Sequence, residues 1–129
     1  MSKKIGTIGW LDLTVQNADE ISDFYNKVVG WQVLPFAMND YNDYMMKDPA
    51  TGDVVSGICH ARGSNADLPA QWMVYIYVAD LDSSLEKCTQ LGGKLLSPVR
   101  NYGDDGKYCI IQDPAGAVMA LFESLEKSE

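Results

Sequence analysis

The sequence predicts an α+β fold built from two β-α-β-β-β modules. The first observation is an internal repeat, because the segment 10–30 has a counterpart at 73–93, and turn residues such as Gly30 and Gly93 recur 63 positions apart. The second is the alternation of residue types in the strand that opens each copy. The third is the helical apolar stripe that follows each of these strands and closes at a glycine.

The first module opens with a strand at 10–15 whose two faces differ in character. The apolar face and the opposite face consist of Leu11, Leu13 and Val15 against Trp10, Asp12 and Thr14. Asn17 or Asp19 can cap the helix that follows, and Gly30 suits the left-handed residue that ends it. The apolar stripe of this helix consists of Ile21, Phe24, Tyr25 and Val28.

Three shorter strands complete the first module. The first, at 31–34, is expected to stop at Pro35. The second covers 41–46 and is followed by the turn signal Asp-Pro-Ala-Thr-Gly at 48–52. The third covers 54–60. Within it, alternation places Ser56, Ile58 and His60 on one face and Cys59 on the other, toward the helix.

A polar segment at 61–71 without periodicity links the modules, which we place at about 5–60 and 72–123 of a single domain. The second module opens with a strand at 73–78, and Asp80 caps a helix that stops at Gly92-Gly93. Further strands are expected at 94–96, 107–112 and 117–122. The total is eight strands and two helices.

Composition and charge indicate the cellular compartment and argue against some classes of partner. The formal net charge of −8 repels phosphate backbones, and the ten Lys and Arg are scattered, so we expect no nucleic-acid partner. No apolar run approaches the ~18 residues that span a bilayer, and the start lacks a signal peptide's apolar core, so no membrane partner is expected. The three cysteines form no Cys-x-x-Cys pair, which indicates a reducing cytoplasm.

The module arrangement, together with the motif Asp-Leu-Thr-Val-x-x-Ala-x-x-x-x-x-Phe-Tyr-x-x-Val-x-Gly-Trp at 12–31, resembles the vicinal oxygen chelate superfamily. This group includes glyoxalase I, bleomycin-resistance proteins, fosfomycin-resistance transferases and extradiol dioxygenases. The resemblance implies that two modules form a half-open barrel around a cavity, with helices on its convex side. It also implies a homodimer, for which Trp31, Trp72 and the linker are the candidate surface.

The same resemblance implies metal-ligand positions on the first and last strands of each module. These positions fall on Trp10, Met73 and Ala120, and approximately on Ser56. None of these side chains is a good ligand for a divalent metal, which takes imidazole, carboxylate or thiolate. We therefore expect no metal and no cofactor at the usual centre.

Asp12 and His60 are the candidate catalytic residues. A carboxylate between Leu11 and Leu13 is poorly suited to a strand, so Asp12 acts either as a ligand acceptor or general base, or as a structural hydrogen-bond partner. His60, the only histidine, is expected to face the same cavity, although a lone histidine is more often structural. Arg62 either clamps an anionic ligand or pairs with an aspartate, and we favour the pair.

Aromatic side chains supply the predicted walls of the pocket. The ligand-binding set is Trp10, Asp12, Tyr44, His60, Arg62, Trp72, Tyr75 and Phe122. Such walls with a few polar groups are typical of a site for a planar or partly anionic organic molecule. The alternative is that the rings fill the barrel mouth or a subunit interface.

Three function classes are compatible with these features. The preferred one is a small-molecule-binding protein of the glyoxalase/bleomycin-resistance type without the usual metal centre. The second is an enzyme, either a glyoxalase-like lyase or another catalyst of the superfamily that uses Asp12 and His60, with or without a metal. The third is an interaction module that kept the fold and lost the chemistry.

Overall fold

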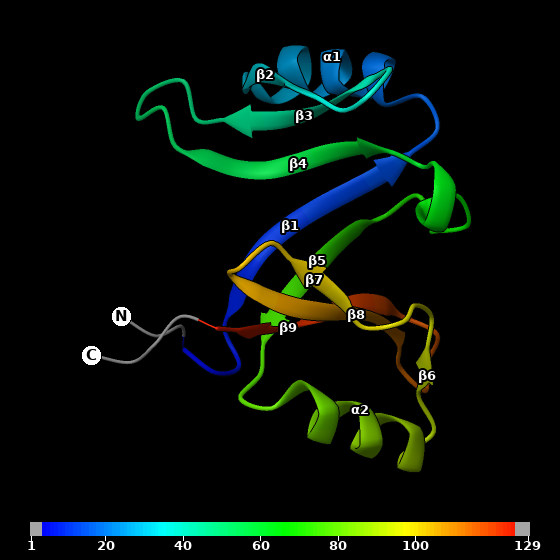
Figure 1. The fold of residues 1–129 in the computed structure, drawn as a ribbon. Coiled ribbons are helices and arrows are strands. Elements are labelled where there is room, and N and C mark those ends of the chain that lie inside the picture. The colour runs from blue at the N-terminus through cyan, green and yellow to red at the C-terminus, as the bar shows by residue number, and fades with distance from the viewer. Residues whose placement is uncertain (1–3, 126–129) are drawn as a thin grey trace. The chain divides into compact units, whose positions relative to one another are not determined.

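The computed structural model describes residues 4–125 except for the side chain of Ser64. The chain divides into two compact units, shown in Figure 1. The N-unit is Trp10–Trp72, and the C-unit combines Met1–Gly9 with Met73–Glu129. Each unit has one α-helix and several strands, which confirms the predicted α+β class. No helix in the described range is long and apolar enough to cross a membrane.

The N-unit follows the predicted order β-α-β-β-β. Its elements are β1 (Ile8–Val15), α1 (Ala18–Val29), β2 (Gln32–Ala37), β3 (Asn42–Lys47) and β4 (Val54–His60), and β1 begins within the C-unit. Its strands lie in the order β2-β3-β4-β1, with β4 parallel to β1 and the other pairs antiparallel. The short helix η1 (Gly63–Asn65), which was not predicted, lies in the linker.

The prediction that Pro35 stops the second strand is wrong, because β2 continues to Ala37 and pairs Pro35 with Tyr44 of β3. Proline lacks the N–H that a central strand needs, but β2 lies at the edge of the sheet. The missing donor therefore interrupts no ladder on the outer side of this strand.

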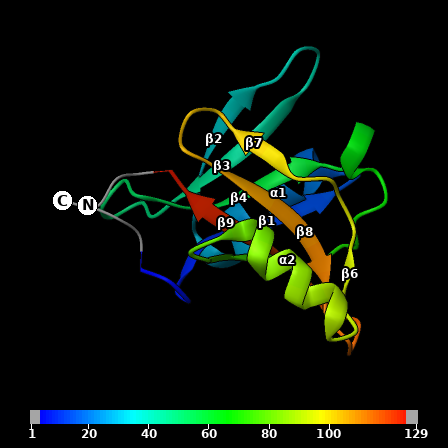
Figure 2. The same cartoon turned by 60° about the horizontal axis from the view of Figure 1, so that its bottom comes forward.

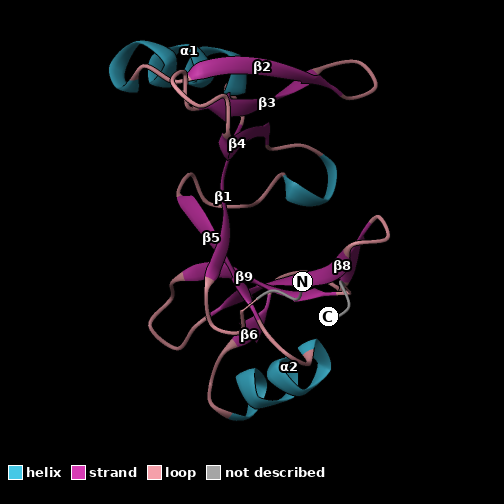
Figure 3. Ribbon diagram, turned by 90° about the vertical axis from the view of Figure 1, so that its left-hand side faces the viewer, coloured by secondary structure: helices cyan, strands magenta, loops and turns pink. Residues whose placement is uncertain are grey.

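Strand register divides the side chains of the N-unit sheet between two faces. Leu13 is paired with Ile58, and both pack with Ala18 of α1 and with Met46 in a buried cluster. We call this side the α1 face. Figure 3 shows α1 running along β2 and β3, and it also contacts β4. The neighbouring pair, Asp12 and Gly57, points to the opposite side, which we call the Asp12 face.

The C-unit contains one α-helix, as predicted, and one strand more than predicted. Its elements are β5 (Trp72–Tyr77), whose first residue belongs to the N-unit, α2 (Leu81–Gln90), β6 (Lys94–Leu95), β7 (Arg100–Tyr102), β8 (Gly106–Gln112) and β9 (Val118–Ser124). The strands lie in the order β5-β9-β8-β6, and β7 pairs with β8. The described part of the chain thus has nine strands rather than eight, because β7 is a three-residue strand that carries no apolar alternation.

Helix ends follow local sequence rules in most places. Asp80 accepts a hydrogen bond from the Ser83 amide at 3.2 Å and so caps α2 as predicted. Gly30 ends α1 with φ 92°. Asn17, in contrast, makes no side-chain cap bond to α1. In Figure 2, α2 lies across β8 and β9, where Leu81 and Leu85 pack in a buried cluster with residues of β8.

Candidate functional site

Asp12 lies on the Asp12 face of β1, in a notch that Gly57 leaves open. A β-carbon on Gly57 would come within 2.5 Å of Asp12 Oδ1 and 3.2 Å of the Trp10 ring. Gly57 is buried and is paired with Asp12 across the parallel strands. The absence of a side chain at Gly57 is therefore what gives the Asp12 carboxyl its room.

The Asp12 carboxyl is surrounded by weak donors and by one like charge. Cys59 Sγ donates to both carboxylate oxygens, at 3.5 and 3.7 Å, and the Trp10 side chain also donates. Burial raises the pKa of Asp12 to about 6, the nearby Asp43 adds to the rise, and the two donors oppose it. Asp12 therefore exchanges a proton close to neutral pH.

The prediction that Cys59 faces the helix is wrong. The parallel register pairs Cys59 with Thr14, two residues from Asp12, and so places the thiol on the Asp12 face. Burial and the Asp12 charge raise the pKa of this thiol. Cys59 is thus a proton donor and not a thiolate nucleophile.

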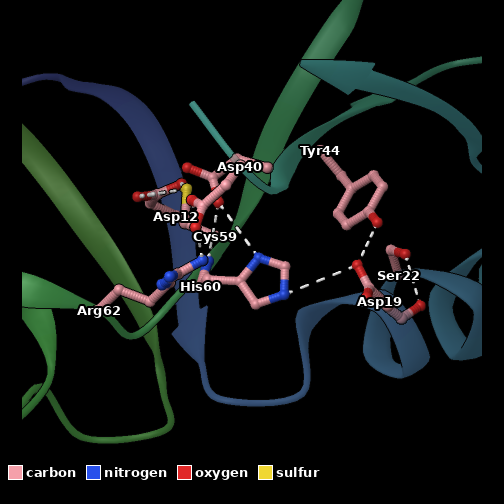
Figure 4. A network of polar contacts seen from close by, with 9 residues as sticks. Asp12, Asp19, Ser22, Asp40, Tyr44, Cys59, His60 and Arg62 are labelled. Atoms are coloured by element: carbon pink, nitrogen blue, oxygen red, sulfur yellow. Dashed lines mark hydrogen bonds and ion pairs between the residues drawn. The ribbon is translucent and has the colours of Figure 1, made fainter. Parts of the chain in front are cut away.

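His60 does not share a face with Asp12, contrary to expectation. Its neighbour on the same side of β4 is Ile58, which is buried beneath α1. Nδ1 lies 3.5 Å from Asp43 Oδ1, and Nε2 lies 3.6 Å from Asp19 Oδ1 (Figure 4). The error arose because alternation shows which residues of β4 share a face, but it does not show which face of β1 they share. That relation depends on the pairing register.

Two further candidates contact the surroundings of His60. Tyr44 donates its hydroxyl to Asp19, and its ring is among those that pack against the cluster under α1. The bond to Asp19 raises the pKa of Tyr44 to about 12. Arg62 Nη1 lies 3.6 Å from Oδ1 of the exposed Asp40. Arg62 thus pairs with an aspartate, which is the alternative that we favoured from the sequence. Tyr44 therefore lies on the α1 face and not beside Asp12.

Trp72 packs inside an aromatic cluster on the α1 side. Its indole N–H donates to the Tyr25 hydroxyl at 3.1 Å, and its ring meets those of Tyr25 and Trp31 edge-on. All three rings pack against the buried cluster of the N-unit. These contacts are those of a structural residue.

Tyr75 and Phe122 belong to the C-unit and lie on the face of its sheet opposite α2. Register pairs Tyr75 with Ala120, and both Tyr77 and Tyr108 with Phe122. The rings of Tyr108 and Phe122 are stacked at 6.3 Å. These rings form one aromatic surface within the C-unit.

Strand register shows which residues lie at the positions where the resemblance implies metal ligands. Tyr75 pairs with Ala120 as Asp12 pairs with Gly57, so Gly57 is the counterpart of Ala120. Ser56 was expected there, but it pairs with Met46 of the buried cluster and lies on the α1 face. A glycine, an alanine, Trp10 and Met73 offer no imidazole, carboxylate or thiolate, so this donor set does not fit a divalent metal.

A separate hollow opens between α1 and the edge of the N-unit sheet. Its volume is about 500 Å³, and its lining is Ser22, Asp23, Asn26, Gln32, Val33, Leu34 and Lys47. None of the predicted site residues lies in it. We assign the candidate site to the Asp12 face because a half-buried carboxyl with a raised pKa is the stronger sign of function.

Sequence reasoning missed Gly57, Cys59 and Asp43 as neighbours of Asp12. A glycine in the middle of an apolar strand indicates a close approach of another group, so Gly57 carried a usable signal. Cys59 and Asp43 carried none, because both depend on the register between β1, β3 and β4.

Known proteins resemble this chain over most of its length. One family model, described as Glyoxalase/Bleomycin resistance protein/Dioxygenase superfamily, matches residues 7–121. The "Putative glyoxylase CFP32" of Mycobacterium tuberculosis is 28% identical over 120 residues, which is 92% of this chain and 46% of that protein. The "Anthracycline biosynthesis protein DnrV" of Streptomyces peucetius is 23% identical over 129 residues, 91% of this chain and 46% of that one. The chain spans about half the length of these curated relatives.

Solved structures share the fold at low sequence identity. A variant of methylmalonyl-CoA epimerase from Streptomyces coelicolor, in complex with 2-nitronate-propionyl-CoA, has a TM-score of 0.60 at 14% identity, covering 95% of this chain and 100% of that one. The epimerase of Mycobacterium tuberculosis has a TM-score of 0.58 at 15% identity, covering 98% and 93%. The fold and the family match agree: this chain belongs to the glyoxalase/bleomycin resistance protein/dioxygenase superfamily.

Proposed function

We propose that this protein binds a small organic molecule at the Asp12 face of the N-unit without a metal at the superfamily's usual position. The observation that carries the proposal is Asp12 itself. Burying a carboxyl in a strand costs free energy, and a residue of that kind persists where it has a partner to bind. The groups described around it are a thiol, an indole and a second carboxyl, none of them a cation.

This environment favours a ligand that donates a proton or carries a positive charge. Asp12 and Asp43 both repel anions, and the chain has a formal net charge of −8. Arg62, which could have clamped an anion, is paired with Asp40. Trp10 beside the carboxyl offers a ring for stacking. A planar amine therefore suits the site better than the partly anionic molecule expected from the sequence.

Binding of 4-aminoquinoline and of quinoline-4-carboxylate, followed by quenching of tryptophan fluorescence, tests the proposal. The amine should bind and the carboxylate should not. Asp12→Asn should weaken the amine about 10- to 100-fold, because it removes a charge-assisted hydrogen bond. Asp23→Asn, an exposed carboxylate of α1, is the matched control and should leave binding unchanged. Equal binding by wild type and Asp12→Asn would refute the assignment.

A metal-free acid–base enzyme is the second candidate, and the raised pKa of Asp12 favours it. A carboxyl that titrates near pH 6 is suited to removing a proton from a carbon acid at neutral pH. The couple would not be Asp12 with His60, because His60 lies on the α1 face. Solvent deuterium exchange into the carbon next to a ligand carbonyl, abolished in Asp12→Asn, would distinguish catalysis from binding alone.

The setting of this activity is also part of the proposal. We propose a cytoplasmic homodimer that takes a small-molecule ligand and neither nucleic acid nor membrane as a partner. The three free cysteines and the acidic charge support this setting.

A further inference from the structure

Both ring nitrogens of His60 face carboxylates from different elements (Figure 4). Asp43 belongs to β3 and lies 3.5 Å from Nδ1, while Asp19 belongs to the first turn of α1 and lies 3.6 Å from Nε2. The histidine side chain is only 12% exposed. Water therefore has limited access to compensate for a nitrogen without a partner.

A neutral imidazole cannot satisfy this arrangement. It has one N–H donor and one lone pair, so one of its two nitrogens must turn a lone pair toward a carboxylate. An imidazolium donates from both nitrogens. Nδ1 is buried and has no hydrogen-bond partner in the described structure, and both separations exceed the ~2.8 Å of a charge-assisted bond. Protonation would supply the missing donor and shorten these contacts.

We propose that His60 is a proton-dependent latch that holds the first turn of α1 to β3 and to the end of β4. When His60 is protonated, it bridges Asp19 and Asp43, and the first turn of α1 is fixed to the sheet. When it is neutral, one of the two contacts is lost and the turn loosens. Asp43 also lies near the Asp12 carboxyl, so the latch and the Asp12 face share one carboxylate.

No side-chain cap fixes the start of α1. Asn17 precedes the helix but makes no side-chain cap bond, and its amide contacts Glu20 only at 3.4 Å. Ser22 donates to the backbone carbonyl of Asp19, which is a contact within the turn itself. The bridge through His60 is thus the polar contact that ties the carboxylate of this turn to β4.

The other groups around His60 are compatible with this role. Tyr44 of β3 donates its hydroxyl to Asp19, and the ring of Tyr41, which precedes β3, meets the imidazole edge-on at 5.3 Å. Beyond β4, the guanidinium of Arg62 lies 4.0 Å over the Tyr41 ring and pairs with Asp40. The charge of Arg62 therefore has its own partner. Asp19 Oδ1 accepts from the Tyr44 hydroxyl and Asp43 Oδ1 from the His60 backbone amide at 2.9 Å, so protonation of the ring would add a charged donor to each carboxylate.

Amide hydrogen exchange in the first turn of α1 tests the latch. Because Asp12 also titrates near pH 6, the test uses the Asp12→Asn protein as its background. Histidine takes up a proton roughly between pH 8 and pH 5. Exchange of the amides at 18–22, corrected for the intrinsic pH dependence, should be about fivefold slower at pH 5.5 than at pH 8, the effect expected of two partly exposed ion pairs.

His60→Gln in the same background should remove this pH difference, and Asp19→Asn should remove it as well. Asp40→Asn changes a neighbouring carboxylate outside the bridge and should preserve it. A pH difference that survives His60→Gln would overturn the latch. If His60→Gln does not fold, the ¹⁵N shifts of the His60 ring decide the question in its place. Two protonated nitrogens at pH 5.5 together with slower exchange at 18–22 than at pH 8 support the latch, and a ring whose protonation changes without any change in that exchange refutes it.

Discussion

Asp12 makes the stability of the protein depend on pH in a predictable direction. Its pKa is raised from 3.8 to about 6 by burial, so the folded chain holds this proton more tightly than the unfolded chain. The stabilisation is complete below pH 3.8 and is lost as the pH rises through 6. The loss amounts to about 3 kcal/mol at pH 8. Asp12→Asn should therefore unfold at higher urea concentration than wild type at pH 8 and at a similar concentration at pH 4. A lower midpoint at pH 8 would mean that the carboxylate is structural.

Gly57 and Asp12 should be energetically coupled, since a side chain at 57 meets the carboxyl at 2.5 Å. Gly57→Ala should cost roughly 1–3 kcal/mol through overpacking. In Asp12→Ala, the same change should cost at least about 1 kcal/mol less, because the clashing oxygen is gone. Urea unfolding of the four proteins measures the coupling. Equal costs in both backgrounds would place the strain at Trp10 instead.

At the scale of elements, the cap of α2 gives a direct prediction. Asp80→Ala removes the hydrogen bond to the Ser83 amide and should lower the free energy of unfolding by about 1 kcal/mol. Asn17→Ala at the start of α1 is the matched control. It should cost less, because Asn17 makes no cap bond. Thermal unfolding of both variants compares the two helices, and an equal loss would contradict the capping argument.

Local sequence rules predicted the helix ends that depend only on neighbouring residues. Asp80 and Gly30 act within a few residues of their own helix, and both were predicted correctly. The facing of His60 and Cys59 was predicted wrongly, because it depends on how β4 pairs with β1, more than forty residues away. The candidate site was therefore only partly predictable: Asp12 stood out by its chemistry, whereas its neighbours were fixed by long-range register.

At the scale of the whole molecule, the proposed dimer has a surface that can be tested. The rings of Trp31 and Trp72 pack against Tyr25. The ring of Phe24 contacts Tyr25 edge-on, and Phe24 is 52% exposed. Sedimentation at micromolar concentration should show a dimer, and Phe24→Glu should shift it toward monomer by placing a charge in the contact. Lys27 lies on the same helix and is exposed and already charged, so Lys27→Glu serves as the control. A monomer in wild type would remove the proposal.

The C-unit is assembled from two stretches that are far apart along the chain, and this has a consequence for synthesis. The Gly6 amide donates to the Tyr77 carbonyl at 2.8 Å, and the Tyr77 amide donates to the Thr7 carbonyl at 3.0 Å. The Tyr77 ring also occupies the place where a side chain on Gly9 would be. On the ribosome, residues 6–9 emerge before Tyr77 and remain without these partners until Tyr77 leaves the exit tunnel. The N-unit can meanwhile close on itself, so the segment that precedes it along the chain acquires its partners only after the N-unit has been synthesised.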